Sequence, residues 1–217
     1  MALETKAPPR LIYRVARMPD AWAPLDWSLA LPDGTFGNRF DDPESEYRVL
    51  YASSQEVGCF VETLARFRPN LEKLAAVKTI VGDNDFTSPG RVPSGWERNR
   101  ALGTARGEGS FADICGTEWI AHLRPKLASD CVRLGLKEFD ASVLQGAAPR
   151  MITQLASRIA YELGYPGIYY RSRYGRDLEN WALFEPFRIS DAYSRAITRD
   201  YPALVQAAEI LGIEVGR

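Results

Sequence analysis

The segment 151–184 constrains the fold most, because a helical pattern passes directly into two strand patterns. Apolar residues recur at helical spacing over 151–163, and Gly164 follows at the position where helices commonly end. This stripe consists of Ile152, Leu155, Ile159 and Leu163. Residues 167–171 and 180–184 then form two β-rich runs that are separated by a polar turn. The pattern predicts a helix that is followed by two strands.

Two earlier β-rich runs and a capped helix extend this pattern. Residues 10–16 follow two prolines and are rich in β-forming side chains, and residues 48–52 form a second short run of this kind. A helix is expected to open at Ser53, because Ser53 as N-cap and Glu56 at the third position match a capping box. Pro69 lies just beyond its expected end.

Two stretches are rich in turn-forming residues and are expected to be loops. Residues 18–37 carry three prolines and two tryptophans, which indicates an irregular, partly buried loop rather than disorder. Residues 83–110 are rich in Gly, Pro, Ser and Asn, and they suggest an insertion near 83–118. Long ordered loops tend to be functional, so a lid is one interpretation of this insertion.

The remaining segments have weaker patterns. A strand is expected in the second half of 74–81, and a helix over 113–127 that ends near Pro125. The tail 191–212 reads as two short helices broken at Pro202.

Strands and helices thus mix without the regular alternation of a parallel sheet, which predicts an α+β fold. The chain has 217 residues, enough to bury a substantial core in one domain. Because no repeat, low-complexity tract or linker divides it, residues 1–217 are interpreted as a single domain.

Charge, cysteines and the N-terminus limit the classes of function. The formal net charge is −1, so a general electrostatic grip on nucleic acid or on an anionic membrane is not expected. The cysteines Cys59, Cys115 and Cys131 are widely spaced and odd in number, which suits reduced thiols. The N-terminus has no apolar signal region, and no apolar run reaches the length of a membrane span. A cytoplasmic protein is expected.

Common catalytic signatures are missing from the sequence. His122 is the one histidine and lies in the middle of an expected helix, where a structural role is the simpler interpretation. No paired-histidine or CxxC spacing indicates a zinc site. The glycine-rich stretch 103–109 matches neither a P-loop nor a dinucleotide-binding fingerprint. The sequence therefore does not resemble a metalloenzyme, a P-loop NTPase or a Rossmann dehydrogenase.

Three polar residues in the first third of the chain are candidates for a ligand site. Arg39 follows Gly37 and Asn38 in a turn-forming stretch, where a guanidinium suits phosphate oxygens but an ordinary surface arginine fits as well. Arg14 in the first strand points outward or needs a partner. Tyr51 ends a strand, where its ring either stacks on a planar ligand or belongs to the core.

Three further candidates are Glu62, Ser172 and Asn180. Glu62 falls away from the apolar face of its helix and precedes Arg66 by four residues, which is the spacing of an exposed ion pair. Ser172 closes a β-rich run between two arginines, which form either a phosphate patch or a solvated strand end. Asn180 begins the next strand.

These segments resemble, in order and spacing, the RES domain, which is named for an arginine, a glutamate and a serine. The matching segments are Tyr13-Arg14, Gly37-Asn38-Arg39-Phe40, Tyr51-Ala52-Ser53, Val61-Glu62, Gly167-Ile-Tyr-Tyr-Arg-Ser172, Asn180 and Leu183-Phe184. The resemblance covers roughly residues 10–187 and leaves 188–217 as a C-terminal helical extension. Asn38 and Phe40 replace the usual Gly and Trp, and the segment near 83–118 is longer than in compact members.

The resemblance implies a fold and an activity. RES-domain proteins are toxins of Xre–RES toxin–antitoxin systems, and their compact mixed β-core flanked by helices is similar to that of ADP-ribosyltransferases. They degrade NAD⁺ by hydrolysis or phosphorolysis of the nicotinamide–ribose bond, as a glycohydrolase or a phosphorylase. Some members ADP-ribosylate a protein. ADP-ribosyl transfer to protein and a nucleotide-binding or interaction module without turnover are therefore the alternatives.

The resemblance also assigns roles and partners. Arg39 would bind the NAD⁺ pyrophosphate with Arg14 as a helper, and Tyr51 would pack against the nicotinamide or its ribose. Glu62 would be the key carboxylate and Ser172 a polar group in the nicotinamide pocket, with Asn180 as a weaker substrate-binding candidate. NAD⁺ is then a substrate, and no metal or other cofactor is implied. A helical Xre-type antitoxin that covers the cleft is an expected partner, and a homodimer is a further one.

Overall fold

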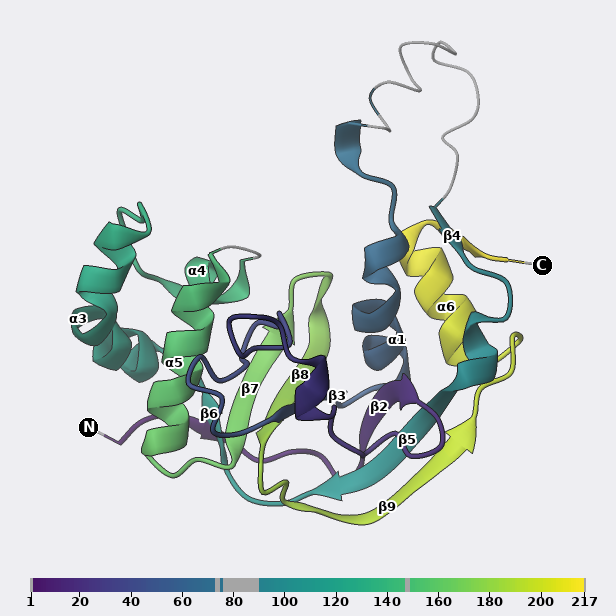
Figure 1. Ribbon diagram of the computed structural model, residues 1–217, viewed down its shortest axis with the longest axis horizontal. Coiled ribbons are helices and arrows are strands. Elements are labelled where there is room, and N and C mark those ends of the chain that lie inside the picture. The colour runs from purple at the N-terminus through teal and green to yellow at the C-terminus, as the bar shows by residue number, and fades with distance from the viewer. Residues whose placement is uncertain (1, 73–74, 76–89, 147–148, 217) are drawn as a thin grey trace.

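A curled sheet organises the chain (Figure 1), and the computed structural model describes residues 2–72, 75, 90–146 and 149–216. Its strands lie in the order β1 (Thr5–Lys6), β6 (Phe111–Asp113), β7 (Gly167–Ser172), β8 (Gly175–Phe184), β3 (Val49–Ser53), β2 (Ile12–Arg17), β5 (Arg100–Gly107) and β9 (Ile189–Ala196). Within this sheet β6 and β7 are parallel, and the other neighbours are antiparallel. The predicted α+β class is confirmed.

Helices gather in two groups at opposite ends of the curled sheet (Figure 1). The first group contains α3 (Thr117–Arg133), α4 (Ala141–Gln145) and α5 (Arg150–Glu162), and the second contains α1 (Glu56–Leu64) and α6 (Pro202–Leu211). Beside the second group, β4 (Gly90–Val92) pairs in parallel with β10 (Ile213–Val215). Three short 3₁₀ turns complete the described elements, at Trp27–Leu29, Ala65–Phe67 and Trp96–Asn99. Within the described part of the chain, no helix combines the length and apolar character needed to cross a bilayer.

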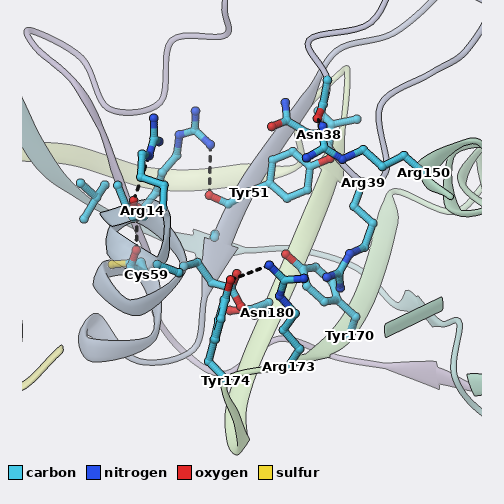
Figure 2. A pocket seen from close by; sticks show the side chains of 18 of the residues that line it. Arg14, Asn38, Arg39, Tyr51, Cys59, Arg150, Tyr170, Arg173, Tyr174 and Asn180 are labelled. Carbon is cyan, nitrogen blue, oxygen red and sulfur yellow. Dashed lines mark hydrogen bonds between the residues drawn. The ribbon is translucent and has the colours of Figure 1, made fainter. Parts of the chain in front are cut away.

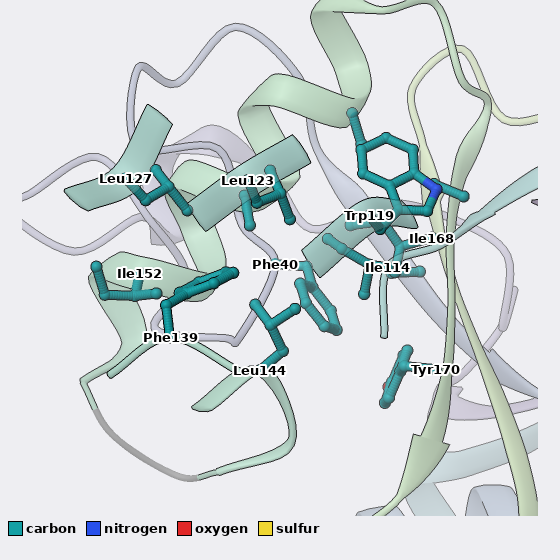
Figure 3. Close-up of a cluster of buried hydrophobic side chains, with 14 of the residues drawn as sticks. Phe40, Ile114, Trp119, Leu123, Leu127, Phe139, Leu144, Ile152, Ile168 and Tyr170 are labelled. Atoms are coloured by element: carbon teal, nitrogen blue, oxygen red, sulfur yellow. The ribbon is translucent and has the colours of Figure 1, made fainter. Parts of the chain in front are cut away.

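Separate apolar clusters hold the two groups of helices on the sheet. Trp119 of α3 and Ile152 of α5 are fully buried in one cluster with Ile168 of β7 (Figure 3). At the other end, Phe60 of α1 packs in a second cluster with Leu204 of α6. Each of the aliphatic and phenylalanine side chains buried in this way contributes about 1.5–3 kcal/mol to folding. Because each cluster is local, the polar surface between α1 and α5 remains available for a site.

The helix and the two strands predicted over 151–184 are present as α5, β7 and β8, but β8 begins at Gly175 rather than at Asn180. Gly164 follows the helix in the left-handed conformation, with φ of 82°, as expected for a residue just past a helix end. Leu163, which the stripe included, is 50% exposed because the helix has already ended there. The turn between the two strands is tight, since Ser172 pairs with Gly175.

The capping box predicted at Ser53 is wrong. Ser53 is the last residue of β3 and pairs with Asn180 of β8, and its hydroxyl donates to the carbonyl of Glu179 at 2.8 Å. The helix begins at Glu56, with Gln55 as N-cap and no side-chain cap bond. The hydroxyl lies beside Gly58 in the first turn of the helix and accepts the N–H of Gln55 at 3.4 Å, but Ser53 itself stays paired in the sheet, so tertiary structure overrides the local capping pattern.

The loop predicted over 83–110 is wrong for the residues that the structure describes. β5 covers Arg100–Gly107 and lies inside the sheet between β2 and β9. Its Gly and Arg content is unusual for a strand, but most of its residues are buried by the neighbouring strands. The helix predicted over 113–127 starts later, at Thr117, and continues through Pro125 to Arg133, because Leu123 and Leu127 on either side of the proline are anchored in the core.

The prediction of two short helices over 191–212 is wrong for the first half of this segment. Its first half is β9, which pairs with β5, rather than a helix, and only the second half is helical. Pro202 starts α6 instead of breaking it, which agrees with the tolerance for proline in the first turn. The predicted strand within 74–81 lies outside the described residues, apart from Ala75.

Candidate active site

A cavity of about 510 Å³ opens between α1 and the start of α5, over β2, β3 and β8 (Figure 2). Its walls come from segments far apart in the sequence, namely the loop at 37–39, helix α1 and the turn between β7 and β8. The volume lies within the range of small-molecule sites, roughly 300–1,000 Å³.

The charge in this cavity is strongly one-sided. Its arginines are Arg14, Arg39, Arg66, Arg150 and Arg173. Glu62 is the one carboxylate among the residues that line it. None of these arginines forms an ion pair with a residue that the structure describes. The cavity is therefore built for an anionic ligand.

Arg14 is fixed in place by backbone carbonyls instead of by a carboxylate. Its Nε donates to the carbonyl of Ala21 at 2.8 Å, and its Nη1 donates to the carbonyl of Tyr51 at 3.0 Å. Burial lowers the pKa of Arg14 to about 10, so the group stays charged at neutral pH. Arg14 is therefore a partly buried cation without a counter-ion among the described residues, and a bound phosphate would supply one.

A buried carboxylate shapes the loop that carries Arg39. Asp41 accepts the N–H groups of Phe36 at 2.9 Å and Asn38 at 2.7 Å, and the hydroxyl of Tyr51 at 3.3 Å. Burial raises the pKa of Asp41. The guanidinium of Arg39 then lies 5.5 Å from the centre of the Tyr170 ring, at hand for a ligand in the cavity.

Helix α5 holds the same loop from the other side. Thr153 donates its hydroxyl to the carbonyl of Arg39 at 2.5 Å, and Gln154 donates to the carbonyl of Asn38 at 3.1 Å. Arg150 donates to the carbonyl of Gly37. The position of Arg39 is thus set by residues more than a hundred positions later in the chain.

Tyr51 combines the two roles that its sequence context left open. It lines the cavity, and its hydroxyl accepts the N–H of Phe40 at 2.9 Å while it donates to Asp41. Burial, together with the charge of Asp41, raises the pKa of Tyr51 well above its usual value. The hydroxyl is therefore a structural bridge between β3 and the Arg39 loop.

Replacing Tyr51 with phenylalanine should lower the free energy of unfolding by about 1–3 kcal/mol, because the buried N–H of Phe40 loses its acceptor. Urea unfolding followed by circular dichroism would measure the loss. Tyr193→Phe is the matched control, since Tyr193 is 54% exposed. Equal stability of the Tyr51→Phe and Tyr193→Phe variants would contradict the bridging role.

Glu62 turns toward the cavity rather than toward open solvent. Phe60, Val61 and Leu64 of α1 are buried in the apolar cluster, which leaves Glu62 on the face toward β8. One of its carboxylate oxygens accepts the side-chain N–H of Asn180 at 2.9 Å. The ion pair predicted with Arg66 is not formed, because Arg66 donates instead to the carbonyl of Thr63 at 3.2 Å. The helical wheel correctly placed Glu62 away from the apolar face of α1, but it did not predict that Asn180 of β8 lies opposite Glu62.

Comparison with known proteins identifies the family of this chain. The RES domain matches residues 11–204. The chain belongs to the RES-domain family. No curated protein matches it. Among solved structures, a chain of the M.tuberculosis MbcT–MbcA toxin–antitoxin complex is similar, with a TM-score of 0.50 and 13% sequence identity over 95% of this chain and 91% of that chain. This likeness concerns the fold.

This RES domain brings five of the six predicted residues together. Those that line the cavity are Arg14, Arg39, Tyr51, Glu62 and Asn180. Ser172 is 6% exposed and is not part of the lining, and its hydroxyl accepts the N–H of Tyr174 at 3.1 Å in the turn between β7 and β8. Ser172 thus shapes the turn that carries Arg173 into the cavity, and its role in a nicotinamide pocket stays a prediction.

The RES-domain cavity also contains residues that the sequence did not single out. Tyr170 lines the cavity together with Glu62 and Arg39, and burial together with the charge of Glu62 raises its pKa. Tyr174 accepts a hydrogen bond from Arg173 at 2.6 Å. Tyr170 reaches the cavity because it pairs with Asn180 of β8, which places the two side chains on the same face of the sheet.

Proposed function

We propose that this RES-domain protein is a toxin that degrades NAD⁺ by cleaving its nicotinamide–ribose bond. One observation carries the proposal: a single carboxylate, Glu62, faces a cavity whose other charges are five guanidiniums. NAD⁺ has a pyrophosphate with two negative charges and, beyond the ribose, a cationic ring as leaving group. The charges of the cavity and of the ligand are therefore complementary at both ends.

The arginines would supply binding and positioning. Arg39 and Arg14 are the proposed ligands of the pyrophosphate, because neither forms an ion pair with a residue that the structure describes and both are held in place by hydrogen bonds to the rest of the fold. Correct placement of a reacting group accounts for up to about 7–11 kcal/mol of a barrier. Since Arg14 and the Arg39 loop are anchored before ligand binding, little of this contribution is lost to reorganisation.

Glu62 would stabilise the reacting ribose. When the C1′–N bond breaks, its electron pair goes to the nicotinamide nitrogen, which becomes neutral, and positive charge develops on the ribose ring. A carboxylate close to that charge lowers the barrier, as in glycoside hydrolysis. The new C1′–O bond forms to water or phosphate, whose proton passes to solvent. NAD⁺ is the substrate here, and the proposal requires no further cofactor.

We also propose an antitoxin as the partner of this chain. The similar solved structure is described as a toxin–antitoxin complex, and the cationic cavity would be closed by an acidic segment of such a partner. A cytoplasmic location stays a prediction from the sequence, and a homodimer stays a prediction from the family resemblance.

The test is the fate of NAD⁺ labelled in its adenylate half, with and without phosphate in the buffer. The expected result is free nicotinamide with soluble labelled ADP-ribose, or, when phosphate is present, with ADP-ribose that carries a phosphate on the same C1′ carbon. Label retained on protein would indicate ADP-ribosyl transfer instead. Intact NAD⁺ together with a rise in melting temperature would indicate a binding module, because any ligand specific for the folded state stabilises it. Either of these two outcomes would overturn the proposal.

A further inference from the structure

Asn180 occupies an unusual position beside Glu62. It lies within β8, paired with Tyr170 on one side and Ser53 on the other, and is 1% exposed. Figure 2 shows Asn180 beside Tyr170. The Nδ2 of Asn180 donates to the Glu62 carboxylate at 2.9 Å. No residue that the structure describes donates a hydrogen bond to its buried Oδ1. A buried polar atom without a partner costs free energy, so this one calls for an explanation.

The direction of the amide follows from the chemistry of its neighbour. An ionised carboxylate only accepts hydrogen bonds, so the Nδ2 of Asn180 must point to Glu62 and the Oδ1 must point away. Turning the amide over would set two acceptors, Oδ1 and the Glu62 carboxylate, against each other. The fold therefore leaves one hydrogen bond unmade at Oδ1 in order to aim a donor at Glu62.

We propose that Asn180 is a positioning residue that acts through Glu62, and that the fold retains it in the sheet for this purpose despite its unpaired oxygen. The donor from rigid β8 fixes the rotamer of Glu62, which otherwise sits on a helix face with no other described hydrogen bond to its carboxylate. The inference rests on the proposed function, because Glu62 is taken as the carboxylate that acts on the ribose. It differs from the predicted role of Asn180 in binding substrate directly.

Two substitutions distinguish the effect of the hydrogen-bond donor of Asn180 from the effect of its side-chain volume. Asn180→Ala removes the donor at every pH. Asn180→Asp has nearly the same shape, and it provides a donor only while the pair of carboxylates holds one shared proton, a state that is lost as the pH rises. The other charged and titratable groups that line the cavity with Glu62 are Arg14, Arg39, Tyr51, Cys59, Arg66, Arg150, Tyr170, Arg173 and Tyr174. These are the same in wild type and variants, so the ratio of variant to wild-type rate cancels their contribution.

The measurement is the rate of nicotinamide release between about pH 5 and about pH 8, divided by the wild-type rate at each pH. For Asn180→Asp the ratio should fall at least about tenfold over this range, whereas for Asn180→Ala it should stay low and flat. Misplacement of a reacting group lowers the reaction rate by up to about 100-fold. We expect Asn180→Ala to lower kcat by this amount and to leave KM nearly unchanged.

The outcomes separate the two proposals. If the wild type releases no nicotinamide, the proposed function fails. If the wild type is active and both variants show the same flat ratio, or Asn180→Ala keeps the wild-type kcat, the positioning role is overturned. Urea unfolding of both variants shows whether the sheet is intact. If Asn180→Ala does not fold, the pH dependence of the nearly isosteric Asn180→Asp decides the question alone.

Discussion

Replacing Glu62 with glutamine should lower the rate of nicotinamide release from NAD⁺ by about 100- to 1,000-fold, the size of effect seen when one electrostatic contact to a transition state is lost. Glutamine has nearly the same shape and can still accept the N–H of Asn180, so the substitution removes mainly the negative charge. The positive charge that develops on the ribose then faces a cavity of guanidiniums without a counter-charge.

Binding should respond differently from turnover. Removing a negative charge from a cationic cavity does not weaken its attraction for the pyrophosphate, so Glu62→Gln should still bind NAD⁺ in calorimetric titration. Glu209→Gln is the matched control, because Glu209 is an exposed glutamate on α6 outside the cavity. If Glu62→Gln retained a rate within about threefold of the Glu209→Gln variant, Glu62 would have no part in the chemistry.

Replacing Arg14 with methionine should weaken NAD⁺ binding by about 10- to 150-fold, corresponding to the roughly 1.5–3 kcal/mol of a hydrogen bond to a charged group. Methionine keeps most of the length and apolar contact of the arginine side chain but has no charge and no donor. Titration of the catalytically disabled Glu62→Gln background with NAD⁺ would measure the change in affinity without turnover.

The same substitution should also affect stability. The carbonyls of Ala21 and Tyr51 lose the donors that Arg14 supplies, which costs about 1–3 kcal/mol for each carbonyl left buried without a partner. Arg17→Met is the matched control, because Arg17 is an exposed arginine in the same strand. Unchanged affinity in Arg14→Met, with folding confirmed by circular dichroism, would contradict the proposed contact with the pyrophosphate.

The correctly predicted parts of the fold are those whose sequence pattern is complete within one local segment. The periodicity of α5, the glycine after it and the two strands of the following hairpin are neighbours in sequence, and all of them are present. β5 and β9 were not predictable in this way. Their residues are ordinary for loops or helices, and they become strands because each supplies hydrogen bonds to the other across the sheet.

The residues of the candidate site show the same difference between local patterns and long-range packing. Arg39 was expected in a turn and Tyr51 at a strand end; Tyr51 lies instead in the middle of β3, and both residues line the cavity. The pattern around Glu62 predicted an exposed ion pair, because a helical wheel does not show that β8 places Asn180 opposite it. No sequence pattern indicated Arg150, because only the packing of α5 on the Arg39 loop brings it to the cavity.

The central claim is that the cavity between α1 and α5 cleaves NAD⁺ with Glu62 as its carboxylate. The most direct test mixes the purified wild type, in excess, with NAD⁺ and follows free nicotinamide by chromatography, beside Glu62→Gln under the same conditions. We predict complete conversion by the wild type within a time in which Glu62→Gln releases almost none. No nicotinamide from a folded wild type, or equal release by both proteins, would contradict the claim.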